Sequence, residues 1–107
     1  MISYESFKNI EESRRFKLLD DMISELLETD EYKDYSGDEI AAWSDENIIK
    51  TYNKVVAKGM LNNLINDLES ARLEIQQYIN NEVVEECIND SIEQLGRASK
   101  GLEEENA

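Results

Sequence analysis

The chain has 107 residues and a formal net charge of −14, and it contains neither histidine nor proline. Nucleic acids and anionic membranes repel such a polyanion, so we expect it to bind neither of them and to favour basic partners. Without histidine the chain lacks the commonest general base and metal ligand, and without proline its helices can run long.

Near the N-terminus, apolar residues recur at helical spacing over residues 16–26. This stripe predicts a helix over about residues 13–29. Phe7 and Ile10 lie outside the stripe, and they indicate a short N-terminal helix or turn that ends near Glu12.

A loop is predicted over residues 30–39, where acidic residues surround a turn signal at Gly37. Asp38 is the expected N-cap of a helix of one or two turns, and Trp43 is expected to pack that helix onto the rest of the fold. Ser44 is the next expected N-cap, because two acidic residues follow it in the first turn, where negative charge is favoured.

The C-terminal half is predicted to contain three helices. The first begins at Asp45, and a rotation of the apolar stripe past Gly59 predicts a turn or a kink there. The next stripe consists of Met60, Leu64, Leu68, Ala71, Ile75 and Tyr78. A second rotation after Asn81 marks the last helix, which is expected to end at Gly96 or soon after. Its apolar side includes the single cysteine, Cys87, for which we expect a buried and inert thiol.

The expected fold is all-α, a small helical bundle of about four main helices plus one or two short ones. The predicted organisation is a single helical domain over residues 1–98, followed by a flexible acidic tail over residues 99–107. The main alternative merges residues 60–98 into one long helix, which would need a dimer to bury both of its apolar stripes. The start of the chain lacks the blocks of a signal peptide, and a single cysteine cannot form an internal disulfide, so we expect a cytoplasmic protein.

The negative charge is concentrated in two segments. Residues 28–47 contain eight acids and one base, and residues 80–107 contain eight acids and two bases. Residues 48–79, with three acids and four bases, are the expected core and the expected place for self-association. The one basic cluster, Arg14, Arg15 and Lys17, is expected to pair with the chain's own acids or with those of a second copy.

The last predicted helix carries a row of acidic residues on one face. The row consists of Glu82, Glu86, Asp90 and Glu93, with Glu85 beside them. A spacing of four residues puts carboxylates about 6 Å apart along the helix axis, which resembles the separation of successive phosphates on a nucleic-acid strand. Two interpretations stay open at this point, a solvated face and a row that imitates phosphates.

No pattern typical of catalysis or of a bound cofactor is present. The acidic loop around Gly37 does not fit an EF-hand, because the twelfth position of that motif would be Trp43 instead of Glu. Di-iron helical bundles require histidine, which the chain lacks. We therefore expect no enzyme activity, no metal site and no cofactor.

The remaining class is a non-catalytic acidic interaction protein. The leading hypothesis is an inhibitor that binds a basic, nucleic-acid-binding protein. The chain's size and composition, without any shared motif, are similar to those of acidic helical phage proteins that mimic DNA and block restriction or CRISPR systems. The alternatives are a structural or adaptor subunit, a homodimer formed through the neutral central helices, and an immunity protein against a basic toxin. The candidate partner-binding residues are Asp30, Glu31, Tyr32, Asp34, Tyr35, Asp38, Glu39, Glu82, Glu85, Glu86, Asp90 and Glu93.

Overall fold

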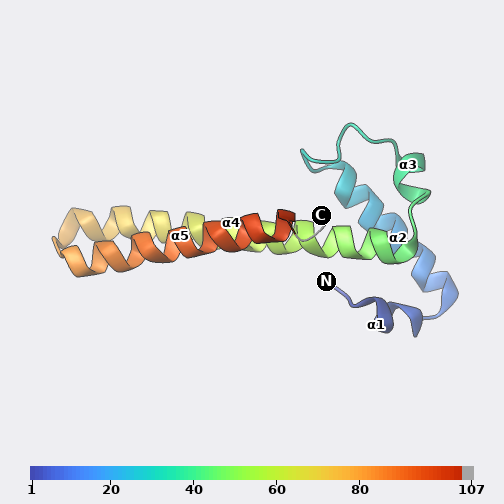
Figure 1. Ribbon diagram of the computed structural model, residues 1–107, viewed down its shortest axis with the longest axis horizontal. Helices are drawn as coiled ribbons and strands as arrows, with labels where there is room; N and C mark the ends of the chain where they lie inside the picture. Colours follow the sequence, from blue (N-terminus) through green and yellow to red (C-terminus); the bar gives the residue numbers. More distant parts are fainter. Residues whose placement is uncertain (105–107) are drawn as a thin grey trace. The chain divides into compact units, whose positions relative to one another are not determined.

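The computed structural model describes residues 1–104, which form five helices joined by turns and irregular backbone, without a strand (Figure 1). The helices are α1 (Tyr4–Lys8), α2 (Glu12–Leu27), α3 (Gly37–Ala41), α4 (Asp45–Tyr78) and α5 (Glu82–Glu104). Helices α2, α4 and α5 are long, whereas α1 and α3 span five residues each. The predicted all-α class is confirmed, with three main helices where about four were expected.

The chain divides into two compact units, residues 1–56 (unit 1) and residues 57–107 (unit 2). The boundary falls inside helix α4, so no linker separates the units. Helix α5 runs to Glu104, well past its expected end near Gly96. Residues 99–104 are therefore helical, and residues 105–107 of the predicted tail lie outside the described residues. The single domain over residues 1–98 stays a prediction.

Unit 1 has a small apolar core to which all of its helices contribute. The buried apolar side chains are Phe7 from α1, Met22 and Leu26 from α2, Ile40 from α3, and Ile48 and Ile49 from α4. Each helix thus removes one apolar side from water, which is the main favourable contribution to packing. Trp43 packs against this core as predicted, and Tyr32 packs there as well.

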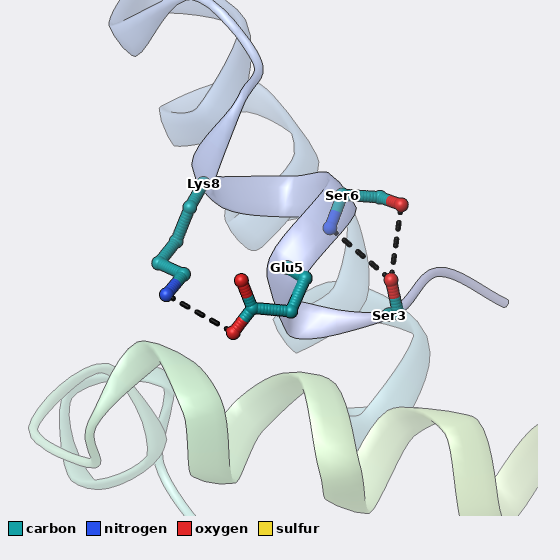
Figure 2. Close-up of polar contacts among 4 residues, drawn as sticks. All are labelled: Ser3, Glu5, Ser6 and Lys8. Atoms are coloured by element: carbon teal, nitrogen blue, oxygen red, sulfur yellow. Dashed lines mark hydrogen bonds and ion pairs between the residues drawn. The ribbon is translucent and has the colours of Figure 1, made fainter.

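Helix α1 is short, and polar side chains of the helix and of its N-cap residue contact one another (Figure 2). Ser3 is the N-cap, and its Oγ accepts a hydrogen bond from the Ser6 backbone N–H at 3.1 Å. One turn further along, the Lys8 ammonium lies 3.1 Å from the Glu5 carboxylate. Both residues of this ion pair are well exposed, so the pair adds little stability, and the position of α1 depends on the burial of Phe7.

Two polar contacts tie the start of the chain and helix α2 to α4 within unit 1. The Asn53 side-chain amide donates to the Ile2 carbonyl at 2.7 Å and accepts from the Ile2 N–H at 3.3 Å. Tyr52 forms a hydrogen bond with Glu25, and this bond, together with burial and nearby negative charge, raises the pKa of the Tyr52 hydroxyl. Polar contacts therefore flank the apolar core where α4 passes the N-terminal segment.

Helix α3 begins with a capping box at Ser36, two residues before the predicted cap at Asp38. The Ser36 Oγ accepts from the Glu39 N–H at 3.1 Å, and the Glu39 carboxylate accepts from the Ser36 N–H at 3.2 Å. Ser44 caps α4 as predicted, because its Oγ accepts from the Asn47 N–H at 3.2 Å. These side chains satisfy donors that the first turn of a helix leaves unpaired.

Removing the capping box should destabilise unit 1. We expect Ser36→Ala to lower the free energy of unfolding by about 0.5–2 kcal/mol, the usual loss when an N-cap hydroxyl is removed. Trp43 is the only tryptophan, so its fluorescence during urea unfolding follows unit 1. Ser24→Ala, at an exposed position inside α2, is the matched control, and equal midpoints for the two variants would mean that the cap is not stabilising.

Helix α4 continues through Gly59, so the chain does not form a turn at this residue, and the predicted kink stays a prediction. No glycine in the described residues has a positive φ, and a Cβ added to Gly59 would meet no atom within 4 Å. The apolar stripe rotates because α4 packs on the core of unit 1 before this point and on α5 after it. A helix interior tolerates one glycine at a cost of about 1 kcal/mol.

Since Gly59 has no conformational or steric role here, its replacement should stabilise the protein. We expect Gly59→Ala to raise the free energy of unfolding by about 0.5–1 kcal/mol, because alanine restricts the unfolded chain more and favours the helix. Thermal unfolding followed by circular dichroism measures this change. Gly96→Ala, also in open space within α5, should give a similar gain; destabilisation by Gly59→Ala would contradict a continuous α4.

In unit 2, the second part of α4 lies antiparallel beside α5 (Figure 1). The Lys58 ammonium bonds the Glu103 carboxylate at 2.8 Å, and the Arg72 guanidinium donates to the Asn89 side chain at 2.6 Å. The two contacts are separated by the same number of residues along α4 as along α5. Two antiparallel helices in constant register require this equality. The chain reverses at residues 79–81, so the alternative of one helix over residues 60–98 is wrong.

The two helices meet along a seam of half-buried residues whose spacing alternates mostly between three and four. From α4 the seam contains Leu61, Ile65, Leu68, Arg72 and Ile75, and from α5 it contains Val84, Ile88, Ile92, Leu95, Ser99 and Leu102. The predicted apolar stripe begins on the wrong residues, because Met60 and Leu64 are 52 % and 50 % exposed. The seam instead uses the residue that follows each of them.

Candidate acidic interaction surface

The twelve predicted partner-binding residues form two groups, one in each unit. Seven belong to residues 30–39 in unit 1, and five belong to α5 in unit 2. All of them are exposed except Tyr32, which is half-buried. The two groups differ in how far their side chains are already engaged in local structure.

Three aromatic rings in unit 1 pack on one another. Tyr32 and Tyr35 stack with ring centroids 5.6 Å apart, and both rings form T-shaped contacts with Trp43 at centroid distances of 6.0 and 5.8 Å. Tyr32 and Trp43 also pack against the core, whereas Tyr35 is 40 % exposed. These spacings are those of rings in direct contact, so the cluster fastens the loop and α3 to unit 1, and only Tyr35 presents much surface to a partner.

The carboxylates of the unit 1 group are partly engaged in local structure. Asp30 lies 3.7 Å from the Lys33 ammonium, and Glu39 is part of the capping box. Asp38 stands in the first turn of α3, where its charge favours the helix N-terminus. These local roles account for much of the acidity that the sequence concentrates in this segment.

The acidic row on α5, which we define as Glu82, Glu86, Asp90 and Glu93, is less engaged in local structure, and only Glu82 stands in the first turn of its helix. All four side chains are exposed, and none forms an ion pair or accepts a hydrogen bond within residues 1–104. Successive helix residues are about 100° apart, so these positions lie on the side of α5 that faces away from seam residues such as Ile88 and Ile92. The row therefore presents carboxylates one turn apart to solvent.

Glu85 does not share that face, although the sequence placed it beside the row. It lines a small surface hollow of about 210 Å³ together with Arg72 and Asn81, next to the seam. Glu103 also differs from the row, because the hydrogen bond and the charge of Lys58 lower the pKa of its carboxyl. Acidic residues beside the seam thus have basic neighbours. The acidic row has only Arg97, which lies one turn after Glu93 on the same face and forms no ion pair among the described residues.

The thiol of Cys87 is free and exposed, so the prediction of a buried cysteine is wrong. Ile88, the next residue, occupies the seam, and Cys87 therefore points about 100° away from it. Among the residues that the structure describes, no group of three or more cysteine or acidic side chains is arranged to hold a metal ion.

The basic cluster of α2 forms no ion pair within the described part of the chain, so the expected pairing with the chain's own acids is absent there. Arg14 and Lys17 line a surface hollow of about 640 Å³, in which Glu11 and Asp21 supply the opposite charge. The Nε of Arg15 is buried without a hydrogen-bond partner. This hollow has mixed charge and offers no clear preference for an anionic or a cationic ligand.

Comparison with known protein families, characterised proteins and solved structures finds no match for this chain. Function must therefore be argued from the surface itself. None of the described helices is both long and apolar enough to cross a membrane.

Proposed function

We propose that this is a non-catalytic interaction protein that binds a basic, nucleic-acid-binding protein and blocks its contact with nucleic acid, in the manner of a DNA mimic. The acidic row is the observation that carries the proposal. Its four carboxylates are exposed, lie about one helical turn apart, and have no cationic partner within residues 1–104.

The acidic row carries a small electrostatic cost within the chain. Like charges four residues apart on a helix destabilise it by a few tenths of a kcal/mol per pair. Mixed acidic and basic side chains would keep a helix equally well hydrated, and between Glu82 and Ser99 the only base is Arg97. The row therefore fits selection for an external cationic partner better than selection for solubility.

The mechanism follows from the charge and the spacing of the row. Its carboxylates form charge-assisted hydrogen bonds with Lys and Arg side chains that otherwise hold phosphates. The net charge of −14 attracts a basic partner over a distance, which speeds encounter and makes binding weaken with salt. A restriction or CRISPR nuclease has a surface of the required kind, and so does a basic bacterial toxin, for which the same physics would describe an immunity protein.

Affinity capture tests the proposal. The protein is immobilised, exposed to a nuclease-treated bacterial lysate, and washed at low and then high salt. We expect a basic nucleic-acid-binding protein to be retained at low salt and released at about 1 M salt, where the Debye length is about 3 Å. Retention only of partners that resist high salt would contradict binding through the acidic row.

The second candidate function is that of a structural or adaptor subunit that binds through apolar side chains. Large exposed apolar residues in unit 2 favour it, including Tyr78, which is 80 % exposed. Association of this kind buries apolar surface and survives high salt, so the same capture experiment separates it from the first proposal.

A further inference from the structure

The helix pair of unit 2 ends in an exposed apolar tip, which we define as Tyr78, Ile79 and Val83. The chain reverses direction here, between α4 and α5 (Figure 1). The three side chains are 80 %, 56 % and 69 % exposed, and no other large apolar side chain in residues 1–104 is as exposed as those of Tyr78 and Val83. Side chains this exposed contribute little to the stability of the pair.

Tyr78 and Val83 lie on the same side of the helix pair. On α5, Val83 directly precedes the seam residue Val84. On α4, Tyr78 directly precedes Ile79, which continues the seam spacing of three and four residues after Ile75. Reversing one helix reverses the sense in which its residues wind about the axis, so positions directly before the seam fall on the same side. The apolar tip is therefore one surface at the end of the pair.

Hydrogen bonds fix the backbone on both sides of the reversal. The Ile79 N–H donates to the Ile75 carbonyl at 2.8 Å, so helical bonding in α4 extends to this residue. The Asn81 side-chain oxygen accepts from the N–H groups of Val83 and Val84 at 3.0 and 3.1 Å, which caps α5. A surface whose backbone is already fixed loses little conformational entropy on binding, so the apolar tip is preorganised for docking.

The charge around the apolar tip is negative. Residues 73–96 contain no base and six acids, which are Glu74, Glu82, Glu85, Glu86, Asp90 and Glu93. Glu82 and Glu86 of the acidic row stand one and three residues from Val83, so they border the tip on α5. Glu74 lies about one turn before Tyr78 and borders the tip on α4. The acidic row and the apolar tip are therefore continuous on α5.

The nearest base, Arg72, is engaged on the other side of the pair. Its guanidinium donates to Asn89, and the residue lines the hollow that also contains Glu85. Asn89 and Glu85 each directly follow a seam residue, whereas the apolar tip precedes the seam. A second copy, a nucleic acid and an anionic membrane are all negatively charged and are repelled here. Charge therefore selects a cationic protein as the occupant.

We infer that the apolar tip docks on a basic amphipathic surface of the partner, in which apolar side chains are bordered by Lys and Arg. The inference rests on the proposed function, because the tip and the acidic row contact the same protein. Charge steers the encounter, whereas a desolvated aromatic side chain slows dissociation. Three side chains bury too little surface to hold a partner alone, so the complex still dissociates at high salt.

Two synthetic peptides that differ only in apolar character test the inference. One consists of about 14 Lys and Leu residues, arranged so that a helix has one apolar face, and in the other Gln replaces every Leu. Fluorescence anisotropy of the labelled peptides, kept dilute, measures both dissociation constants at about 0.15 M salt. We expect this protein to bind the Lys/Leu peptide at least about tenfold more tightly, because only this peptide covers the apolar tip.

A matched pair of variants assigns the difference to the tip. Tyr78→Ser removes the exposed ring, and Leu73→Ser removes a leucine that is 59 % exposed and lies on the other side of α4, directly after Arg72. We expect Tyr78→Ser to weaken binding of the Lys/Leu peptide about tenfold and to leave binding of the Lys/Gln peptide unchanged. Leu73→Ser should match the wild type with both peptides, and circular dichroism should show that both variants keep their helices.

Hydroxyl-radical labelling of the wild type gives a second readout that needs no substitution. Tyr78 is 80 % exposed, so its ring should label readily in the free protein and several-fold less in the presence of the Lys/Leu peptide. Phe16, which is 64 % exposed on the basic part of α2, is the internal control. Its labelling should stay the same, because nearby bases repel the peptide.

Equal affinity for the two peptides, or equal losses for the two serine variants, would overturn the inference. Unchanged labelling of Tyr78 would do so as well. Cosedimentation with phosphatidylcholine vesicles that Tyr78→Ser abolishes would also overturn it, since the apolar tip would then bind lipid. Neither variant alters the acidic row, and the Lys/Gln peptide reports on that row alone, so failure here is distinguishable from failure of the proposed function.

Discussion

Neutralising the acidic row with Glu82→Gln, Glu86→Gln and Asp90→Asn together is expected to weaken binding to the basic partner about 10- to 100-fold. Each exposed carboxylate that meets a Lys or Arg contributes roughly 0.5–1 kcal/mol, and 1.4 kcal/mol corresponds to a tenfold change in affinity. The association rate should fall as well, because fewer charges steer the encounter. Surface plasmon resonance at two salt concentrations measures both effects.

A matched control separates the row from net charge. Asp67→Asn, Glu69→Gln and Glu74→Gln remove the same number of charges from exposed positions on α4, and we expect less than a threefold change in affinity. Folding should be unaffected or slightly improved in the row variant, since like charges four residues apart are removed. Equal losses for the two triple variants would show that only overall charge matters.

Truncating the centre of the unit 1 core should have the largest effect on stability. Leu26 has no exposed surface and packs among residues of α1, α3 and α4. We expect Leu26→Ala to lower the free energy of unfolding by about 2–5 kcal/mol, from lost burial and the cavity that remains. The stability of a whole small domain is about 5–15 kcal/mol, so unit 1 should unfold at clearly lower urea concentration, as followed by Trp43 fluorescence.

Phe16 on the same helix provides the contrast, because its side chain is 64 % exposed. Phe16→Ala should change the free energy of unfolding by less than about 1 kcal/mol. Similar losses for Phe16→Ala and Leu26→Ala would contradict the assignment of the buried side of α2.

Features set by local chemistry could be predicted from the sequence. Helix α2 lies within about two residues of its expected bounds, and Ser44 caps α4 as expected. The shared exposed face of Glu82, Glu86, Asp90 and Glu93 follows from their spacing alone, and it is confirmed. Trp43 packs where an apolar ring beside a short helix was expected to pack.

Features set by the choice of packing partner could not be predicted in the same way. A rotation of the apolar stripe at Gly59 is compatible with a break in the helix or with a continuous helix that changes its packing partner. In the structure α4 is continuous. The seam was within reach, because Leu61, Ile65 and Leu68 already alternate by four and three residues. This spacing, unlike the run that begins at Met60, predicts that Leu64 is exposed.

In the candidate site, too, the sequence predicts local features but not those that depend on packing. The charge of residues 30–39 is evident from the sequence, but its partial use in a capping box and an ion pair depends on where Ser36 and Lys33 lie. The exposure of Cys87 depends on the seam passing through Ile88. Composition therefore locates acidity, whereas the fold decides which acids have no partner.

If the protein occupies the nucleic-acid site of a basic partner, it should compete with nucleic acid for that site. The captured partner is first bound to a fluorescently labelled oligonucleotide, and this protein is then titrated in while anisotropy is recorded. We expect the oligonucleotide to be released, the triple variant of the acidic row to require about a 10- to 100-fold higher concentration for the same release, and the α4 triple variant to match the wild type. Formation of a stable ternary complex, with anisotropy unchanged or increased, would show that the protein does not occupy the nucleic-acid site.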